Sequence, residues 1–480
     1  MSHSIRPCPT LNRREFLRLA GIAGSAAVVA SCTPGSSATQ PPPTGNAEEP
    51  QPTDTPSSQA PAAEQITLSW WNQFSTPLCQ ELFPQIIQEF ESQHPNIKVE
   101  YELSGGPPGG GEYIEVLLAR IAAGNPPDTC TLWTPPSEFG ARGALMAIDE
   151  LMAGAAKAKP DAFYEKPLKS CQWKGKTYGL PASAGAGCIF FNKGLFEEKG
   201  ISTKREDFPT TWEGLFDLCR KLTTVENGEV TLAGFVPWAQ SWLRPVYAQN
   251  NGGQIFSADE GVYKINSSNN VEMLEHWLKY LDELYGGDIE AFNLISNWGG
   301  DVYPEGAFQL GKAAIDASGS WAPTDAQIPF EWEIAKFPVG PRGEKSHTGF
   351  YPNWWAMPKG VKFVNEAFLL TEHFCTDGWV YWYINGTMDT PAWKNIPPDI
   401  FCKAVEKTYG TERAIDFHKF FTEYLNDAAE MWTSPIENFA NDTLGQTIDE
   451  VLHKAKTPEE ALANAQELCQ TKLQETLESL

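Results

Sequence analysis

The chain has 480 residues, of which 41% are hydrophobic, and it carries 61 acidic against 36 basic residues for a formal net charge of -25. Its length is sufficient for more than one domain with a core of its own. The negative charge repels nucleic-acid phosphates and anionic headgroups, and no basic run in the folded part offsets it. We therefore expect no binding of nucleic acid.

The amino terminus has the features of a bacterial export signal. Arg13 and Arg14 precede an apolar run at 19–30, which is too short to cross a bilayer. This order resembles a twin-arginine signal, and VASC at 29–32 resembles a lipobox, where a lipoprotein is cleaved and its cysteine acylated. We expect residues 1–31 to be a signal peptide and Cys32 to carry the lipid. A disordered tail that holds a chance cysteine is the alternative.

Residues 32–64 form a segment rich in Pro, Ser and Thr that contains almost nothing apolar beyond alanine. Such a segment cannot bury enough surface to fold, and it is expected to be a disordered tether. The folded part would then be extracytoplasmic and anchored to the cell membrane through Cys32. A tethered protein of this kind is expected to be a receptor or a surface enzyme.

Eight cysteines remain after the signal and the acylated residue are removed. An even number in an exported chain permits disulfides. Cys130, Cys188 and Cys219 lie in apolar patterns, which favours small buried hydrophobic residues over disulfide partners.

Strand and helix patterns alternate along the folded part. A strand at 66–70, an amphipathic helix at 78–92, a strand at 97–103, a helix at 112–123 and a strand at 128–133 together predict a βαβαβ unit. A second lobe follows, with a strand at 188–192, a helix opened by a capping box at 210–213 (TTWE), a helix at 271–285 and a final helix opened by Thr457 and Pro458. The alternation favours an α/β architecture with largely parallel sheets.

Motifs for catalysis are scarce. The glycine-rich stretch at 105–111 is followed by Glu112 where a phosphate-binding loop needs lysine. The seven histidines are scattered, and the serine of 316–321 lacks the frame of a nucleophile elbow. Carboxylate pairs abound in so acidic a chain, but none is singled out. We expect no catalytic residue, no metal and no cofactor.

The seventeen tryptophans are the remaining feature. Trp212 and Trp277 lie on amphipathic helices and are predicted to pack in cores. Others stand at strand ends or in loops among polar residues, where α/β proteins build ligand sites. Their flat faces suit the apolar C–H face of a sugar ring. For each of them alone, packing that anchors a loop explains the position equally well.

Several segments in their order resemble the extracellular solute-binding proteins of ABC importers, specifically the sugar and oligosaccharide group similar to maltose-binding protein (family 1). The resemblance covers nearly all of residues 66–470. It is carried by segments that include ITLSWWNQF at 66–74, LLARIAAGNPPDTCTLW at 117–133, FNKGLFEEKGI at 191–201, NNGGQIFS at 250–257, AFQLGKAAIDASGSW at 307–321 and GFYPNWWAMPKG at 349–360.

The resemblance implies an α/β, two-lobed periplasmic-binding-protein-like fold of type II, with a ligand cleft between lobes joined by hinge crossovers. The first lobe would comprise 66–182 and 355–389, and the second 183–354 and 390–480. The protein would be a monomeric, non-catalytic receptor that captures a sugar or oligosaccharide and delivers it to an ABC permease. The crossover at 179–188 lacks the acidic or large polar residue that several oligosaccharide binders carry, which leaves the sugar undefined.

The resemblance also implies which residues face the cleft. Within SWWNQF, Trp70 would pack under the sheet and Trp71 would meet the solute; likewise Trp354 would lie near the ligand and Trp355 in the first lobe. The full expected set is Trp71, Asn72, Gln73, Trp133, Ser137, Glu138, Trp238, Gln240, Trp242, Ser320, Trp321, Tyr351, Trp354, Trp432 and Asn438.

Two rival functions remain open from the sequence. A receptor for another solute, such as a peptide or a polyamine, would use the same fold, and polyamines would suit the negative charge. A surface carbohydrate-active enzyme would also be rich in tryptophan, and an acid pair across the cleft would be its mark.

Overall fold

The computed structural model describes residues 64–74, 76–101, 111–298, 305–397, 400–429 and 433–479. The expected signal peptide, Cys32 and the tether up to residue 63 lie outside the described residues, as does Trp432. None of the helices in the described ranges is both long and apolar enough to span a bilayer.

Sheet A contains five strands in the order β2-β1-β3-β15-β6. Its strands are β1 (Ile66–Trp71), β2 (Ile97–Tyr101), β3 (Thr129–Leu132), β6 (Leu180–Pro181) and β15 (Trp354–Ala356). β1 runs parallel to β2 and β3 through the crossover helices α2 (Pro77–Gln93) and α3 (Gly111–Ala122), whereas β15 runs antiparallel to both of its neighbours. The predicted βαβαβ unit is confirmed.

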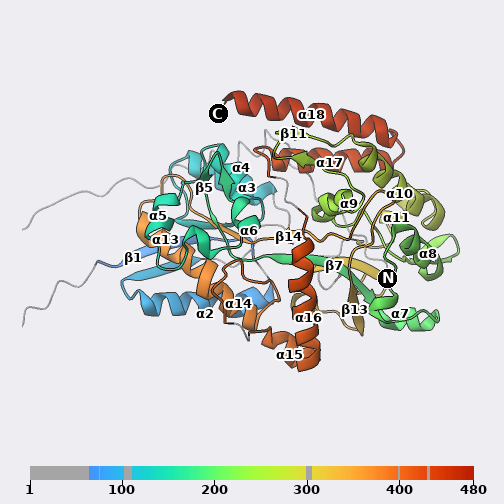
Figure 1. The fold of residues 1–480 in the computed structure, drawn as a ribbon, viewed down its shortest axis with the longest axis horizontal. Coiled ribbons are helices and arrows are strands. Elements are labelled where there is room, and N and C mark those ends of the chain that lie inside the picture. The colour runs from blue at the N-terminus through green and yellow to red at the C-terminus, as the bar shows by residue number, and fades with distance from the viewer. Residues whose placement is uncertain are drawn as a thin grey trace, which may run out of the picture. The chain divides into compact units, whose positions relative to one another are not determined.

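Helices cover both faces of sheet A (Figure 1). One face carries a core with side chains from α2, α13 (Val364–His373), the π-helical turn η4 (Phe374–Gly378) and α14 (Trp379–Asn385). Trp70 and Trp355 lie in this core, with ring centroids 6.2 Å apart. The other face packs on α3 and α4 (Pro136–Ala141), where Trp71 and Trp354 lie. Each tryptophan pair is therefore divided between the two faces, as strand geometry requires.

Sheet B has β7 (Gly185–Asn192) at its centre. Its other strands are β12 (Ile315–Gly319), β13 (Trp332–Ala335) and β14 (Phe350–Tyr351), and all three pair with β7 in the antiparallel sense. The expectation of largely parallel sheets is wrong for sheet B. The strands that pair with β7 lie more than a hundred residues further along the chain. Local sequence patterns therefore could not predict whether these strands run parallel or antiparallel to β7.

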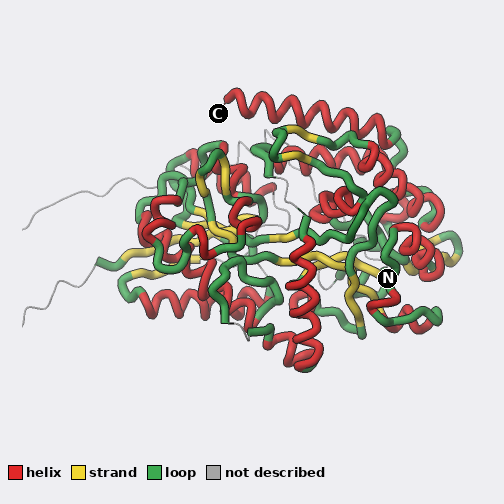
Figure 2. The backbone as a smooth tube through the Cα atoms, in the orientation of Figure 1, coloured by secondary structure: helices red, strands yellow, loops and turns green. Residues whose placement is uncertain are grey.

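Many helices surround sheet B, and the strands of both sheets lie among helices (Figure 2). The helices whose side chains enter the core of sheet B, which we call core B, are α7 (Lys193–Glu198), α8 (Trp212–Leu222), α9 (Arg244–Asn250), α10 (Ser268–Leu284), α11 (Ile289–Asn293), α12 (Ala322–Asp325), α15 (Lys403–Tyr409), α16 (Thr411–Tyr424), α17 (Glu437–Leu452) and α18 (Pro458–Ser479).

Threonine caps begin two of these helices; the start at Thr457 is confirmed, whereas the capping box predicted at 210–213 is displaced by one residue. At α8 the hydroxyl of Thr211 accepts a hydrogen bond from the amide of Gly214, 3.2 Å away. At α18 the Thr457 hydroxyl accepts from the amide of Glu460, and the Glu460 carboxylate accepts from the amide of Thr457, both at 3.3 Å. This reciprocal pair satisfies donors that the first turn of the helix leaves open.

The described chain also contains shorter elements, besides the 3-10 turns at Pro160–Ala162, Arg205–Asp207 and Leu425–Asp427. They are the helices α5 (Asp149–Gly154) and α6 (Glu165–Lys169) and the strand pairs β4 (Gln172–Trp173) with β5 (Lys176–Thr177), β8 (Thr224–Glu226) with β9 (Glu229–Leu232), and β10 (Phe256–Ser257) with β11 (Val262–Tyr263).

The eight described cysteines are all buried and carry free thiols. The reading of Cys130, Cys188 and Cys219 as buried hydrophobic residues is confirmed. Cys188 and Cys219 belong to core B, whereas Cys130 lies beneath sheet A.

Three backbone segments pass between the two sheets side by side. Residues 182–184 lead from β6 to β7, 352–353 lead from β14 to β15, and 389–392 follow α14. The Ala182 amide donates to Asn353 and the Ala184 amide donates to Thr390, both at 2.7 Å. These are the segments in which the sequence placed crossovers, but Trp354, assigned to the second lobe, lies in β15 of sheet A.

Candidate functional site

Three aromatic rings meet beside core B. Trp242 comes from the 3-10 turn η3 (Ser241–Leu243), Trp321 follows β12, and Tyr351 ends β14. The Trp242 ring centroid lies 5.2 Å from that of Trp321 and 4.6 Å from that of Tyr351. All three side chains are half-buried. The sequence named all three residues, and the structure brings them together.

Gln240 orients this ring cluster. Its side-chain oxygen accepts a hydrogen bond of 2.9 Å from Nε1 of Trp242. Its side-chain nitrogen is buried and has no hydrogen-bond partner in the part of the chain that is described. A buried amide donor of this kind costs free energy until a ligand or a water accepts from it.

The turn after β1 positions Trp133 on the side of sheet A. The Gln73 amide donates to the Thr131 hydroxyl, and the Gln73 side-chain oxygen accepts from the amide of Trp133, both at 3.0 Å. Trp133 keeps 38% of its surface exposed, while its ring edge contacts Phe74 at 5.9 Å between centroids. Asn72 accepts from the Phe74 amide at 2.9 Å. Asn72 and Gln73 therefore hold the turn, and Trp133 presents an aromatic face.

α4, beside sheet A, and α17, in core B, are joined through polar side chains. The Glu138 carboxylate accepts a 3.1 Å hydrogen bond from the backbone amide of Asn438 in the first turn of α17. The Thr134 hydroxyl donates to the side-chain oxygen of Asn438 at 3.1 Å. Ile436, the residue before α17, offers no capping side chain, so Glu138 caps the helix from across the two sheets.

Glu138 lies beside a second buried carboxyl, that of Glu437. Burial raises the pKa of Glu138 to about 7, against the lowering effects of Asn438 and Arg142. Burial, and then the nearby Glu138, raise the pKa of Glu437 well above its usual value. Oε2 of Glu437 has no hydrogen-bond partner among the described residues. The two carboxyls thus form an acid pair between α4 and α17.

Buried polar atoms without a partner gather around these elements. Among the described residues they include Oγ of Ser137, Nε2 of Gln240, Nε of Arg244, Oε2 of Glu437 and Nδ2 of Asn438. The Arg244 guanidinium joins the aromatic segment to α17, because its Nη1 donates to the Asn441 carbonyl at 3.1 Å. Native interiors pair nearly all of their polar groups, so such a concentration marks a surface suited to a polar ligand.

Three of the tryptophans predicted to contact the ligand have rings that contact other parts of the protein. Trp354 is 2% exposed, and its Nε1 donates to the Ser170 hydroxyl at 2.9 Å, inside the core beneath sheet A. The Arg120 guanidinium covers Trp71 at 4.5 Å from the ring centroid. Trp238 packs its ring against two aromatic residues of core B. For these positions the loop-anchoring alternative describes the contacts better than a ligand contact does.

Ser320 and Asp389 form a link within the protein. The Ser320 hydroxyl donates to Oδ1 of Asp389 at 2.6 Å and accepts from the amide of Ala186 at 3.3 Å, so it is occupied. A Cβ atom at Gly185 would stand 2.8 Å from Oδ1 of Asp389. The small residues that follow the first crossover, such as Gly185, therefore leave room for the carboxylate of Asp389, which lies in the third crossover.

Sequence reasoning missed Asp389, Arg244 and Glu437. Glu437 directly precedes Asn438, which was named, and only its burial distinguishes it from the many other glutamates. Asp389 could have been found as the lone acid in the third crossover, TMDTP at 387–391.

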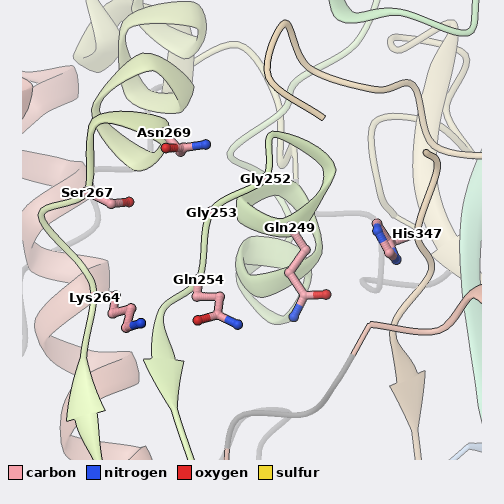
Figure 3. A pocket seen from close by; sticks show the side chains of 8 residues that line it. All are labelled: Gln249, Gly252, Gly253, Gln254, Lys264, Ser267, Asn269 and His347. Atoms are coloured by element: carbon pink, nitrogen blue, oxygen red, sulfur yellow. The ribbon is translucent and has the colours of Figure 1, made fainter. Parts of the chain in front are cut away.

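A separate cavity of about 430 Å³ lies beside α9 (Figure 3). Gln249, Gln254, Lys264 and His347 are among the residues that line it, with Lys264 and His347 at opposite sides of the view. The Lys264 ammonium is paired with Glu260 at 2.6 Å, and none of the predicted site residues lines the cavity. Over the described ranges, no group of three or more His, Cys, Asp or Glu side chains is arranged to hold a metal ion.

Comparisons with known proteins concern the family and the fold of the chain. The profile of the family described as "Bacterial extracellular solute-binding protein" matches residues 77–373. The chain is 23% identical to the multiple sugar-binding protein of Streptococcus mutans over 296 residues, which are 60% of this chain and 64% of that protein. The chain thus spans less than two thirds of that relative.

Solved structures match more of the chain. CpMnBP1 with mannotriose bound superposes with a TM-score of 0.69 at 22% identity, over 84% of this chain and 99% of that one. The maltose/maltodextrin-binding domain of Bdellovibrio bacteriovorus, bound to maltotriose, gives 0.64 at 16% identity, over 85% and 100%. At such identities these matches show a common fold, the two-lobed α/β fold of periplasmic binding proteins.

Proposed function

Because the chain belongs to the family of bacterial extracellular solute-binding proteins, we propose that it is the receptor of an ABC importer, and that its solute is a sugar or an oligosaccharide. The solute would lie between the elements of sheet A and those of sheet B, with Trp133 on one side and the rings of Trp242, Trp321 and Tyr351 on the other.

One observation carries the choice of solute. The half-buried rings stand next to the buried side-chain amide of Gln240, whose nitrogen has no partner in the described residues, and the Ser137 hydroxyl on α4 is buried and unpartnered too. A sugar offers both complements, since its C–H face packs on aromatic rings and its hydroxyls both donate and accept. Each hydroxyl that pairs a buried atom would recover part of the free energy lost on burying it.

The same proposal covers signalling and location. A solute that contacts both sides binds the closed state better, and this difference in affinity is what a permease can sense. The lobes would be 66–182 with 355–389 and 183–353 with 390–480, with Trp354 moved to the first. Export through the twin-arginine signal at 1–31 would place the receptor outside the cell membrane, anchored by the tether and the lipid on Cys32. It would act as a monomer.

The acid pair bears on the rival enzyme. The sequence named such a pair as the mark of a carbohydrate-active enzyme, and Glu138 and Glu437 form one. The family, however, is one of solute-binding proteins and not of enzymes. We therefore assign the pair to binding, and the purified protein should leave oligosaccharides intact on prolonged incubation.

A thermal-shift screen tests the proposal. A ligand that binds only the folded state raises the apparent stability, by about 2.7 kcal/mol at a hundredfold excess over Kd. We expect a mono- or oligosaccharide to raise Tm, and calorimetry to confirm one site per chain. A shift with peptides alone, and with no sugar, would overturn the choice of solute.

A further inference from the structure

When ionised, the acid pair between α4 and α17 is incompletely neutralised by the described residues. Glu138 is 1% exposed and Glu437 is 7% exposed. Arg142 forms an ion pair with Glu138 at 3.5 Å, but its side chain is 47% exposed, so water weakens its effect. The Arg244 guanidinium donates to the Asn441 carbonyl and interacts with Asp442. Within the described chain, the half-exposed Arg142 is thus the cation paired with this acid pair, in which both carboxyls are buried.

The second carboxyl is also incompletely bonded. Oε2 of Glu437 is buried and lacks any hydrogen-bond partner in the described ranges, and Oγ of Ser137, the residue before Glu138, lacks one too. Glu138 is held close by its hydrogen bond to Asn438, the residue after Glu437. A buried carboxylate that is left unpaired is costly, and the same carboxylate becomes favourable once a cation with donors occupies the space.

From this geometry we propose that the acid pair receives a protonated amino group of the solute. The inference rests on the proposed receptor function and specifies its solute further. Two carboxyls are too few to form a metal site by themselves, and the described chain contains no larger group of metal ligands here. An ammonium needs only two or three acceptors, which Glu437, Glu138 and the Ser137 hydroxyl would supply. The formal charge of -25 would further concentrate cations near the protein.

Two sources could supply the amino group: an amino sugar within the proposed solute, or a polyamine. The aromatic cluster of Trp242, Trp321 and Tyr351 lies on the segment that Arg244 joins to α17, the helix of Glu437. This arrangement favours a sugar that carries its amine toward α17. The experiment separates the two sources.

Calorimetry on the mature protein would use matched sugars that carry an amino, an N-acetylamino or a hydroxyl group at the same carbon, with spermidine alongside. We expect at least one amino sugar to bind about tenfold or more tighter than both of its neutral counterparts. Glu437→Gln should remove most of that preference, so that the amino sugar binds the variant little tighter than its neutral counterparts do. Glu138→Gln should act in the same direction, and Glu475→Gln, an exposed position on α18, is the control with the same charge change.

Each result is decisive. Binding of neutral sugars with no preference for any amino partner overturns the amine site and leaves the receptor function standing. Binding of spermidine alone, lost in Glu437→Gln, supports the amine site with a polyamine as its source and overturns the sugar. Binding of none of these compounds overturns both. If Glu437→Gln unfolds in thermal denaturation, the same comparison is made with Glu138→Gln.

Discussion

The carboxylate of Glu138 accepts a hydrogen bond from the backbone amide of Asn438, 300 residues further along the chain. The two residues belong to elements packed on different sheets, so this bond exists only when α4 and the start of α17 are in contact. Because α17 has no capping side chain of its own, the contact also completes the helix. Approach of the two sides is thus coupled to a local gain in hydrogen bonding.

Stability should fall as the pH rises through neutrality, partly because of Glu138. Burial raises its pKa from 4.5 to about 7, so the folded state retains a proton that the unfolded chain has released. The contribution is complete below pH 4.5 and is lost as the pH passes 7, a change of about 3 kcal/mol. The free energy of unfolding, measured by chemical denaturation, should fall less between pH 5 and pH 8 in Glu138→Gln than in the native chain. An equal loss would remove Glu138 as a cause.

Thr134→Val should weaken solute binding. The change removes the hydroxyl that donates to Asn438 and nearly preserves the volume. Losing one hydrogen bond of about 1 kcal/mol shifts the population toward the open state and lowers the affinity about fivefold. Small-angle scattering without solute should detect a larger radius of gyration. Thr408→Val, whose hydroxyl bonds within its own helix, should change neither quantity.

Trp321→Ala should reduce sugar affinity while leaving the fold intact. Its ring is half-buried in the cluster with Trp242 and Tyr351, and removing a stacking face costs about 1 kcal/mol or more of binding. Calorimetry should show an affinity about five- to tenfold lower, with unchanged circular dichroism. Unchanged affinity would exclude Trp321 from the site.

Trp354→Phe should behave in the opposite way. The substitution removes the donor to Ser170 and leaves a gap in a packed core, so the free energy of unfolding should fall by about 1–3 kcal/mol. Solute affinity should stay within twofold of the native value. A large loss of affinity without a loss of stability would restore Trp354 to the site.

All eight described cysteines should resist thiol reagents in the folded mature protein. Each is buried as a free thiol, and burial raises, for example, the pKa of Cys402 to about 11, so little reactive thiolate forms. After denaturation without reductant, eight thiols should react. A smaller number would reveal a disulfide.

The tryptophan pairs illustrate what the sequence could determine. Alternation along a strand places Trp70 and Trp71 on opposite faces, and the apolar pattern correctly assigns Trp70 to the core. The sequence could not show that Arg120, from a helix fifty residues away, covers Trp71. In an α/β layer both faces of a central strand are covered. A side chain that points away from one core, such as that of Trp71, can therefore pack in another core and need not contact solvent.

Other parts of the site depend on contacts between distant segments. The aromatic residues of loops were predictable as a group, because flat side chains among polar neighbours are unusual in sequence as well as in space. The antiparallel pairing of sheet B and the role of Glu437 were not. Both depend on which segments, far apart in the chain, come together. In a sequence with 61 acidic residues, no local pattern distinguishes Glu437 as the carboxyl with an unpaired oxygen.

The position of β15 within sheet A determines when that sheet can form. β15 is paired between β3 and β6 although its residues follow the whole of sheet B in the chain. A nascent chain that ends before residue 354 therefore has no strand to join β6 to the rest of the sheet, and its core still lacks α13 and α14. Neither half can complete folding early, so this topology favours slow, late folding that is exposed to aggregation until synthesis is nearly finished.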